Sequence, residues 1–415
     1  MSLAILLMSL LVFVALNVPI CFSLGASSII YLLIEKPLFL NMLPQRIWAG
    51  TNNFVMIAMP LFILAGELMN RGGITRRIIN FSMLLVRPFR GGLGEVNVVA
   101  SMIFGGISGS SVADTSALGA VLIPAMEKQG YSTGFSAGIT VASSTMGMII
   151  PPSIPMLIYA LISGASVAQL FLAGLIPGLL IGIAQIIVVF SISRKRGYHP
   201  VYRKITPREV LHVTKDGLLA IIMPIVIVVS VSFGIATASE SAGIAVLYAL
   251  LLGFFVYRDL RIHDIIPILK KTVMTSSSVM VIIGFTMIFT WILAIEQVPG
   301  MIGNFIMGLN INRILILLLL DILILFIGTF VDVSPSLLLL CPILIPVMAH
   351  LGINELQLGA IMIVGTAIGL VTPPIGMCLN AATKICDLPI TSIFWHAFPF
   401  LLCNVLILLL VTFVP

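Results

Sequence analysis

The chain has 415 residues, of which 60% are hydrophobic and only 9% are charged, and its formal net charge is +6. Apolar stretches of membrane-spanning length recur from end to end, so the composition excludes a soluble protein and predicts an all-α polytopic membrane protein in a lipid bilayer. The stretches are continuous rather than alternating, which argues against an outer-membrane β-barrel, and the basic residues lie in short loops, where they set topology rather than bind nucleic acid.

Residues 1–90 are expected to form scaffold spans that end in a cytoplasmic arm helix. Residues 1–34 are apolar over too great a length for a signal peptide, and they lack a basic first segment and a small-residue cleavage site, so we expect them to remain in the folded protein. Residues 74–89 are amphipathic with arginines on one side, which predicts a helix lying in the membrane interface. We expect Glu67, at the end of an early span, to make a helix-end or loop contact.

Lysine and arginine gather in three clusters, which the positive-inside rule places in cytoplasmic loops. The clusters fall within residues 71–90, 194–208 and 258–271. An even number of membrane crossings must therefore separate each cluster from the next. No lysine or arginine is expected near the bilayer midplane, so an anionic substrate would be neutralised by bound cations, by helix dipoles or by another subunit.

Residues 91–193 are expected to form the first half of a transport domain. Two apolar stretches, 96–105 and 111–126, are too short to span comfortably, because a spanning helix needs about 20 residues. Between them lies the small and polar sequence 105–111. We predict a re-entrant helical hairpin that enters from the cytoplasm and turns at this tip, followed by a membrane helix over 135–162 that Gly and Pro-Pro break in the middle.

The break in this helix recurs in the second half of the chain, in the same register. One constant offset separates Pro124 from Pro346 and Gly147 from Gly369, and the same offset separates the two Pro-Pro pairs. A register held over so many residues indicates an internal duplication, with an interrupted helix in each copy. Paired interruptions of this kind are the best indication in a sequence of a secondary transporter's binding site.

Residues 313–390 are expected to form the second half of the transport domain. The stretches 314–327 and 337–349 flank a tip at 328–335, and a broken helix follows. Because no basic cluster marks the outer ends of this hairpin, the crossing count places them on the opposite side of the membrane. The expected result is an inverted repeat with two re-entrant hairpins and two broken helices, an architecture of alternating-access transporters.

The segments between and after these halves are expected to complete the scaffold. Residues 194–312 should hold a cytoplasmic loop, further spans and a second arm over 298–312, and residues 391–415 should form the C-terminal span. Glu240, between two spans, is expected to cap a helix or contact a loop. For Asp321 we expect only a polar contact within the second hairpin.

The tips and breaks together predict cation sites. Proline removes a helical N–H and clashes with the preceding turn, so a broken helix frees backbone carbonyl oxygens, which can form cages for a hard cation together with hydroxyl groups. A carboxylate inside a membrane is a functional hypothesis by default, and we expect Asp332 to be a cation ligand. The candidate cation ligands are Ser108, Ser110, Ser144, Gly147, Ile150, Pro151, Gly328, Asp332, Thr366, Gly369 and Thr372.

The same region predicts a substrate site. Short helix N-termini at the tips and breaks carry partial positive charge and can hold a substrate carboxylate. Asp114 lies just past the first tip, where two roles are open: it is a ligand, or it orders the tip. The candidate substrate contacts are Gly109, Ser111, Asp114, Ser153, Thr329 and Pro374.

Five segments of the sequence carry a further signal together: they are 64–73, 105–114, 148–153, 234–242 and 369–376. They resemble the large membrane subunit (M subunit, DctM-like) of tripartite ATP-independent periplasmic (TRAP) transporters, and the resemblance covers essentially the full length. The fourth segment departs from the family's usual Ala-Thr-Pro-Thr-Glu, because Ala238 and Ser239 occupy the middle positions, but it keeps Glu240.

The resemblance implies a secondary active transporter rather than an enzyme. It implies a sodium-driven importer in the bacterial inner membrane, with at least two Na+ sites at the candidate cation ligands, and an elevator mechanism in which a transport domain slides against a scaffold. It also implies two partners, a small four-helix membrane subunit and a periplasmic solute-binding protein that delivers an organic acid. C4-dicarboxylates and sialic acid are the expected substrate classes, and sialic acid is the one to test first.

Two alternatives stay open at this point. A stand-alone sodium-coupled carrier for dicarboxylates or citrate would have a similar inverted repeat and would need no binding protein. An intramembrane aspartyl protease would use Asp114 and Asp332, which would have to lie close enough to share a proton. These two residues lie in separate repeats and lack a Gly-x-Gly-Asp context, which counts against the protease.

Overall fold

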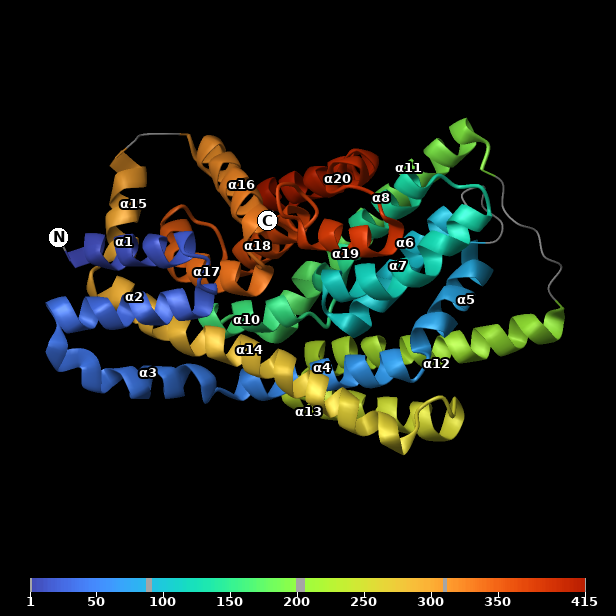
Figure 1. The fold of residues 1–415 in the computed structure, drawn as a ribbon, viewed down its shortest axis with the longest axis horizontal. Coiled ribbons are helices and arrows are strands. Elements are labelled where there is room, and N and C mark those ends of the chain that lie inside the picture. Colours follow the sequence, from blue (N-terminus) through green and yellow to red (C-terminus); the bar gives the residue numbers. More distant parts are fainter. Residues whose placement is uncertain (1, 87–91, 199–205, 309–311, 415) are drawn as a thin grey trace.

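The computed structural model describes residues 2–86, 92–198, 206–308 and 312–414. Every regular element in these ranges is a helix. Judged by length and composition, six of these helices can cross a membrane, and the number rises to eight if each of two bent helix pairs counts as one span. Figure 1 shows an elongated molecule in which many of the longer helices follow the longest axis. The predicted class, an all-α polytopic membrane protein, is confirmed.

The helices fall into four stretches along the chain. The first contains α1 (Ser2–Ala15), α2 (Ile20–Glu35), η1 (Pro37–Asn41), α3 (Met42–Thr51), α4 (Phe54–Arg71) and α5 (Ile74–Val86). The second contains α6 (Leu93–Ser108), α7 (Ser111–Lys128), α8 (Thr133–Ser144), α9 (Met146–Ile149), α10 (Ile154–Ser163) and α11 (Val167–Arg196). The third contains α12 (Pro207–Ser232), α13 (Ala238–Leu251), η2 (Leu252–Val256), α14 (Ile262–Ile295) and α15 (Val298–Gly308). The fourth contains α16 (Arg313–Phe330), α17 (Val333–His350), α18 (Glu355–Gly369), α19 (Met377–Cys386) and α20 (Ile390–Phe413).

The first and third stretches pack together as one layer. α4 lies along α13, and α2 lies along α14. In Figure 1, α3, α4, α12, α13 and α14 of these stretches form the lower part of the view. The two predicted arms are helices: α5 packs against α6 and α12, and α15 packs against α17. Residues 87–89 and 309–311 of the predicted arms lie outside the described residues, and the position of the arms in the membrane interface stays a prediction.

The first hairpin is α6 and α7, and its turn is shorter than predicted. The sequence predicted a tip over 105–111, but α6 continues as far as Ser108, and only Gly109 and Ser110 turn the chain. Gly109 has a φ of +60°, a conformation that favours glycine. The Ser110 hydroxyl then caps α7 by accepting a hydrogen bond from the backbone N–H of Ala113.

The second predicted hairpin, α16 and α17, also has a shorter turn than predicted, but its helices diverge: α16 packs on α18 and α17 packs on α10, with little contact between α16 and α17. Its tip was predicted over 328–335, but α16 continues to Phe330 and α17 begins at Val333. Only Val331 and Asp332 turn the chain. The Asp332 carboxylate caps α17 by accepting a hydrogen bond from the N–H of Val333 over 2.7 Å.

Glycines near the tips allow close packing rather than turning. A Cβ on Gly105 would lie 3.0 Å from the Cα of Gly147, and a Cβ on Gly369 would lie 2.5 Å from the Cα of Gly328. In each half, the first helix of the hairpin therefore touches the backbone beside the break. The predicted tips were too wide because small residues inside a helix, which permit such contacts, have the same composition as a turn.

Both predicted broken helices are present. In the first half, the helix of α8 and α9 is bent by 41° relative to α10, across the break after Ile149. In the second half, α18 ends at Gly369 and α19 begins at Met377. Each break contains a Pro-Pro pair, and these pairs were predicted to interrupt the helices.

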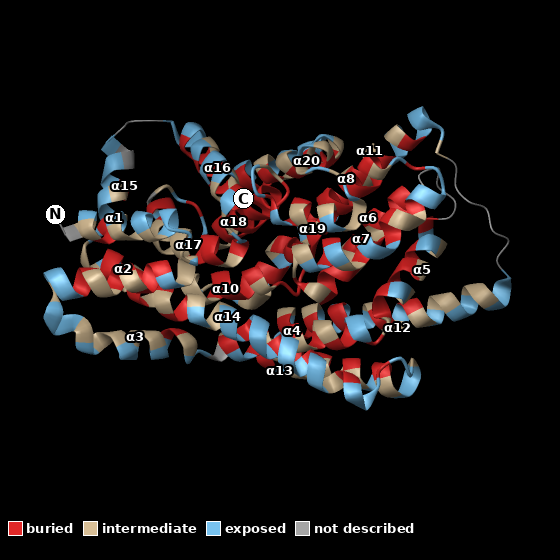
Figure 2. Cartoon of the chain, viewed as in Figure 1, coloured by how far each residue is buried: buried red, intermediate tan, exposed pale blue. Residues whose placement is uncertain are grey.

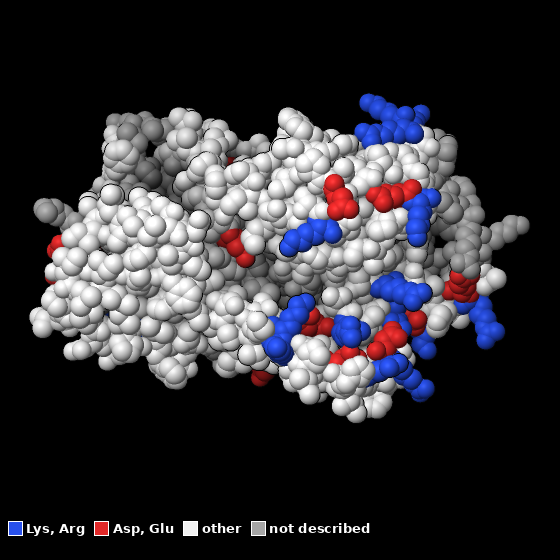
Figure 3. Space-filling view, viewed as in Figure 1, with Lys and Arg blue, Asp and Glu red and all other residues white. Residues whose placement is uncertain are grey.

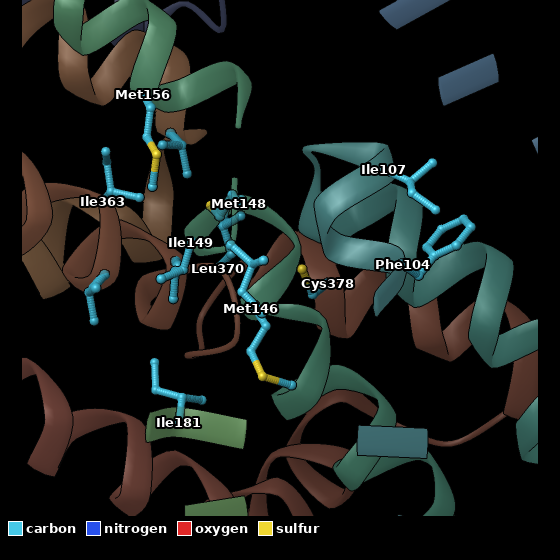
Figure 4. Close-up of a cluster of buried hydrophobic side chains, with 14 of the residues drawn as sticks. Phe104, Ile107, Met146, Met148, Ile149, Met156, Ile181, Ile363, Leu370 and Cys378 are labelled. Atoms are coloured by element: carbon cyan, nitrogen blue, oxygen red, sulfur yellow. The ribbon is translucent and has the colours of Figure 1, made fainter. Parts of the chain in front are cut away.

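The two halves are interlocked across the breaks. α10, which follows the first break, packs on α17, and α19, which follows the second, packs on α7. Figure 1 shows α6 and α7 toward one end of the molecule and α16 and α17 toward the other, and their entry from opposite sides of the membrane stays a prediction. Figure 2 shows that buried residues concentrate where the halves meet. Met146 and Ile149 of α9 share one buried cluster there with Leu370 and Cys378 of the second half, as Figure 4 shows.

Candidate functional site

The first tip places a buried aspartate against the first break. Asp114, in the first turn of α7, is fully buried, and its Oδ1 accepts a hydrogen bond from the Ser108 hydroxyl. Its Oδ2 has no hydrogen-bond partner in the part of the chain that the structure describes, and it lies beside Gly147, where a Cβ would overlap it. One oxygen therefore orders the tip, as one of the two open roles requires, while the other faces the break and its role as a ligand stays a prediction.

The remaining predicted hydroxyls of this half lie on the tip and on α8. The Ser111 hydroxyl is buried and has no hydrogen-bond partner among the described residues. Ser144 accepts a hydrogen bond from Thr115 over 2.7 Å and donates one to the carbonyl of Val141, so it joins α8 to α7. Ser110 caps α7, and its carbonyl accepts from the N–H of Asp114 over 3.0 Å. These hydroxyls and the Asp114 carboxylate provide hard oxygen ligands.

The carbonyls of the first break face the hairpin. A Cβ on Gly106 would lie 3.1 Å from the Pro151 oxygen, and a Cβ on Gly109 would lie 3.3 Å from the Pro152 oxygen. The N–H of Ile150 still donates to its own helix, at Met146. Pro151, a predicted cation ligand, and Gly109, a predicted substrate contact, therefore both lie where the break meets the hairpin, and their roles stay predictions.

Ser153, a predicted substrate contact, uses its hydroxyl within the protein. Its Oγ donates to the carbonyl of Met148 and accepts from the N–H of Met156 at the start of α10. Ser153 is buried as well. The side chain thus holds the two sides of the break together, and its role toward a substrate stays a prediction.

The second tip and break are joined differently. Thr329 and Thr366 each donate their hydroxyl to a carbonyl of their own helix, over 2.7 and 2.6 Å, and Thr372, in the break, donates to the carbonyl of Ile368 at the end of α18 over 2.9 Å. The N–H of Gly376 donates to the carbonyl of Thr329 over 3.4 Å, which ties the break to the tip. With Pro374, Thr329 and Thr372 line a largely apolar hollow of about 430 Å³. The structure therefore brings Thr329, Thr372 and Pro374 together, and the hydroxyl groups of the two threonines already donate hydrogen bonds within the protein.

The two aspartates are not equivalent in the repeat. Asp332 caps α17 as Ser110 caps α7, and the offset of the repeat relates these two positions. The counterpart of Asp114 is Ser336, which is buried and donates to the carbonyl of Asp332 over 2.8 Å. Ser336 was not among the predicted residues, although the constant offset identifies it. No hydrogen bond joins Asp114 to Asp332 in the described chain, so the geometry gives the aspartyl protease no support.

A cavity of about 490 Å³ lies between the first tip and the first and third stretches of the chain. Ser108 and Ser110 line it from the tip, and Glu67 of α4 and Lys271 of α14 line it from the opposite side. Glu67 and Lys271 form an ion pair of 2.8 Å. Two expectations were therefore wrong: Lys271 lies inside a helix rather than in a loop, because α14 begins at Ile262, and Glu67 pairs with another helix rather than capping its own.

Sequence reasoning missed a buried amide network behind the first break. Gln185 of α11 donates to Asn404 of α20 over 2.8 Å, and Asn404 donates to Thr145 over 3.0 Å. Asn97 of α6 donates to Thr140 of α8 over 2.6 Å. These amides could have been recognised in the sequence, because they lie within apolar spans, where a polar group must find a hydrogen-bond partner.

The other two acidic residues have structural partners. Glu240 and Thr237 form a capping box at the start of α13, so the predicted cap is confirmed. Asp321 accepts a hydrogen bond from Thr412 of α20 over 3.1 Å, so the expectation of a contact within the hairpin is wrong. Among the described residues there is no group of three or more His, Cys, Asp or Glu side chains that could hold a metal ion. A cation site in this region would therefore consist mainly of carbonyl and hydroxyl oxygens.

Comparison with known proteins gives one consistent result. The family model for the tripartite ATP-independent periplasmic transporter, DctM component, matches residues 7–415. The chain is 38% identical over 399 residues to the sialic acid TRAP transporter large permease protein SiaM of Vibrio cholerae serotype O1, covering 96% of this chain and 93% of that protein. It is 34% identical over 393 residues to the C4-dicarboxylate TRAP transporter large permease protein DctM of Pseudomonas aeruginosa, covering 95% and 92%. The crystal structure of the Alcanivorax borkumensis YdaH transporter, described as having an unusual topology, matches with a TM-score of 0.68 at 15% identity over 92% of this chain and 89% of that one, which is a likeness of fold alone.

Proposed function

The chain belongs to the DctM component family of tripartite ATP-independent periplasmic transporters, and on this premise we propose that it is the large permease of a sodium-coupled importer of an organic acid. Members of this family are transporters rather than enzymes, and they generally work with a small membrane subunit and a periplasmic binding protein. We propose the same partners here, in the inner membrane of a bacterium. Figure 3 shows the charged side chains gathered toward the end that holds α5 and α12, the end that we assign to the cytoplasm.

The single observation that carries sodium coupling is the contact of Asp114 with the first break. One carboxylate oxygen is fully buried without a hydrogen-bond partner among the described residues, and it faces backbone at Gly147. An ionised carboxylate buried in this state needs a positive charge beside it, which a protonated one does not. A sodium ion between Asp114, the Ser111 hydroxyl and the carbonyls of the break would supply that charge. A second ion would lie at the tip of α16 and α17, with Asp332, Thr366 and Gly369 as the nearest candidates.

An elevator movement is supported by the surface between the two parts of the molecule. A hollow of about 400 Å³ separates α12 from the first half, and apolar side chains line it on both sides, among them Met102, Leu175 and Pro224. A contact without ion pairs or hydrogen bonds between facing side chains can slide without breaking polar interactions. The interlocked halves would move as one body past α12 and its neighbours.

The substrate class follows from the relatives. The two permeases named above are assigned to sialic acid and to C4-dicarboxylates, and both compounds carry carboxylates. We therefore propose a small organic acid as the substrate. A carboxylate next to bound sodium ions is neutralised locally, which makes obligatory coupling to sodium chemically reasonable.

Uptake into proteoliposomes tests this proposal. The chain would be reconstituted with and without a four-helix partner and a binding protein, and uptake of labelled N-acetylneuraminate and succinate would be followed under an inward sodium gradient. Uptake that requires sodium and all three components would support the tripartite importer. Uptake by this chain alone would replace it with the stand-alone carrier, and equal uptake without sodium would remove the coupling.

A further inference from the structure

The cavity over the first tip has two charged residues in its lining, and they form a single ion pair. The Lys271 ammonium lies 2.8 Å from the Glu67 carboxylate, and the pair joins α14 to α4. The side chain of Lys271 is 61% exposed and that of Glu67 is 23% exposed. The polar groups that share the cavity with them, Asn70, Ser108, Ser110, Ser116 and Thr275, are neutral. Lys271 is thus the one cation in the described lining of this cavity.

The pair also lies at the boundary between two hollows. Glu67 and Lys271 line the cavity over the tip, and they line a second hollow of about 420 Å³ that continues along α4 and the start of α14. Arg71 and Asp264, an ion pair of 2.8 Å, line only this second hollow. A solute that moves from the tip toward the start of α14 therefore passes Lys271.

A purely structural role explains this arrangement poorly. An ion pair that faces a water-filled cavity contributes little to stability, because water screens it. α4 and α14 are already joined by the pair of Arg71 with Asp264. Ionisable side chains that face a cavity within a membrane protein generally mark the route of a substrate or ion.

We propose that Lys271 is the group that binds the carboxylate of the transported acid in this cavity, and that Glu67 positions its ammonium. This inference rests on the proposed function. An ammonium group has three N–H donors, so Lys271 can keep its bond to Glu67 and donate to a substrate carboxylate as well. The volume of about 490 Å³ lies within the range of small-molecule sites. The remainder of the acid would lie over Ser108 and Ser110, beside the proposed sodium ligands.

The test compares two lysine variants that each remove one ion pair to α14. Lys271→Met removes the pair inside the cavity. Lys36→Met removes a pair of nearly the same length, 2.9 Å to Glu296, which lies in neither hollow. Lys271→Arg keeps the positive charge and serves as the rescue. Binding of labelled N-acetylneuraminate and succinate would be measured on the purified full chain in lipid nanodiscs with sodium present, and thermal unfolding would be recorded for every variant.

Lys271→Met should weaken binding of both acids roughly tenfold or more, the usual effect of losing a charged hydrogen bond. Lys271→Arg should recover most of the affinity, and Lys36→Met should bind as wild type does. The methyl ester of N-acetylneuraminate should compete equally in wild type and Lys271→Met, because it lacks the charge that Lys271 would bind. Unfolding temperatures of the two methionine variants should be similar.

Three results would overturn the inference: wild-type affinity in Lys271→Met, an equal loss in Lys36→Met, or no binding of either acid to wild type. These results are separate from the test of the proposed function. Sodium-dependent uptake by wild type with unchanged affinity in Lys271→Met would leave the importer standing and remove Lys271 from its site. Binding that depends on Lys271, without uptake in the complete mixture, would keep Lys271 as a binding residue and count against the proposed importer.

Discussion

The carboxylate of Asp114 and the backbone of Gly147 lie in direct contact, although one is on the first tip and the other is at the first break. A Cβ on Gly147 would overlap Oδ2 of Asp114 and would lie 2.7 Å from its Cγ. The hairpin and the broken helix therefore pack without space for a side chain at this point. An ion bound between Asp114 and Gly147 would contact the hairpin and the broken helix at the same time.

Gly147→Ala should abolish most sodium-dependent uptake and lower stability by ~1–3 kcal/mol, because the added methyl group has no space beside Asp114. Thermal unfolding and uptake would be measured together. The control is Gly243→Ala on α13, where a Cβ meets nothing within 4 Å. That change should be neutral or slightly stabilising, because alanine favours helix over glycine. Wild-type uptake in Gly147→Ala would show that the contact has no role in transport.

Asp332→Asn should raise the sodium concentration for half-maximal uptake severalfold while leaving the fold intact. Asparagine caps a helix as well as aspartate does, so α17 keeps its first turn and only the charge is lost. The measurement is uptake against sodium concentration, with an unfolding curve for each protein. An unchanged sodium dependence would reduce Asp332 to a helix cap.

Ser108→Ala should also raise the sodium requirement, because it leaves Asp114 Oδ1 without the donor that orients it. A buried acceptor that loses its partner costs about 1–3 kcal/mol, so the unfolding temperature should fall as well. Ser191→Ala is the matched control, since that hydroxyl is exposed and donates only to the carbonyl of Ile187. If both serine variants had the same sodium requirement and unfolding temperature, the hydrogen bond to Asp114 would contribute to neither.

Asn404→Leu should destabilise the protein by about 1–3 kcal/mol, because Gln185 loses an acceptor and Thr145 loses a donor in the buried interior. The double variant Gln185→Leu with Asn404→Leu should be less destabilised than the sum of the single variants, since the partners are removed together. The thermal unfolding of the wild type, the two single variants and the double variant would be measured in one detergent. Simple additivity would mean that the two amides do not interact.

Arg77→Lys should loosen α5 even though the charge is kept. The Arg77 guanidinium lies 2.6 Å from Asp259 and stacks 3.8 Å from the centre of the Tyr257 ring, which an ammonium group does not reproduce. Hydrogen exchange along α5 should therefore become faster. The adjacent and exposed Arg76, changed to lysine, is the control and should leave exchange unchanged. Equal exchange in both variants would contradict the proposed anchoring.

The features that a sequence pattern encodes directly were predicted well. The first hairpin, the position of the second tip and the two broken helices follow from apolar length, Pro-Pro pairs and a constant offset, and these features are local, whereas re-entry of the hairpins into the membrane stays a prediction. The cap at Glu240 also follows from neighbouring residues. The tips were drawn too wide because Gly105 and Gly328 look like turn residues, yet each is needed inside a helix to approach a break.

The features that depend on distant contacts were not predicted. Lys271 was counted with a loop cluster, because charge alone does not show where α14 begins. The partner of Asp321 is Thr412, on a helix that the hairpin meets only in the folded protein. The network of Gln185 and Asn404 joins residues that are far apart in the chain, and nothing local specifies that pairing.

The packing of α19 on α7 and of α10 on α17, each across the two halves, has a consequence for biosynthesis. α7 ends at Lys128, but α19, which packs on it, begins only at Met377. During translation the first hairpin is therefore inserted long before its covering helix leaves the ribosome. Its polar tip must be shielded in the meantime by lipid headgroups, by water or by the insertion machinery. A protein truncated after α11 would lack that cover permanently, so the two halves should be recovered from membranes only when they are produced together.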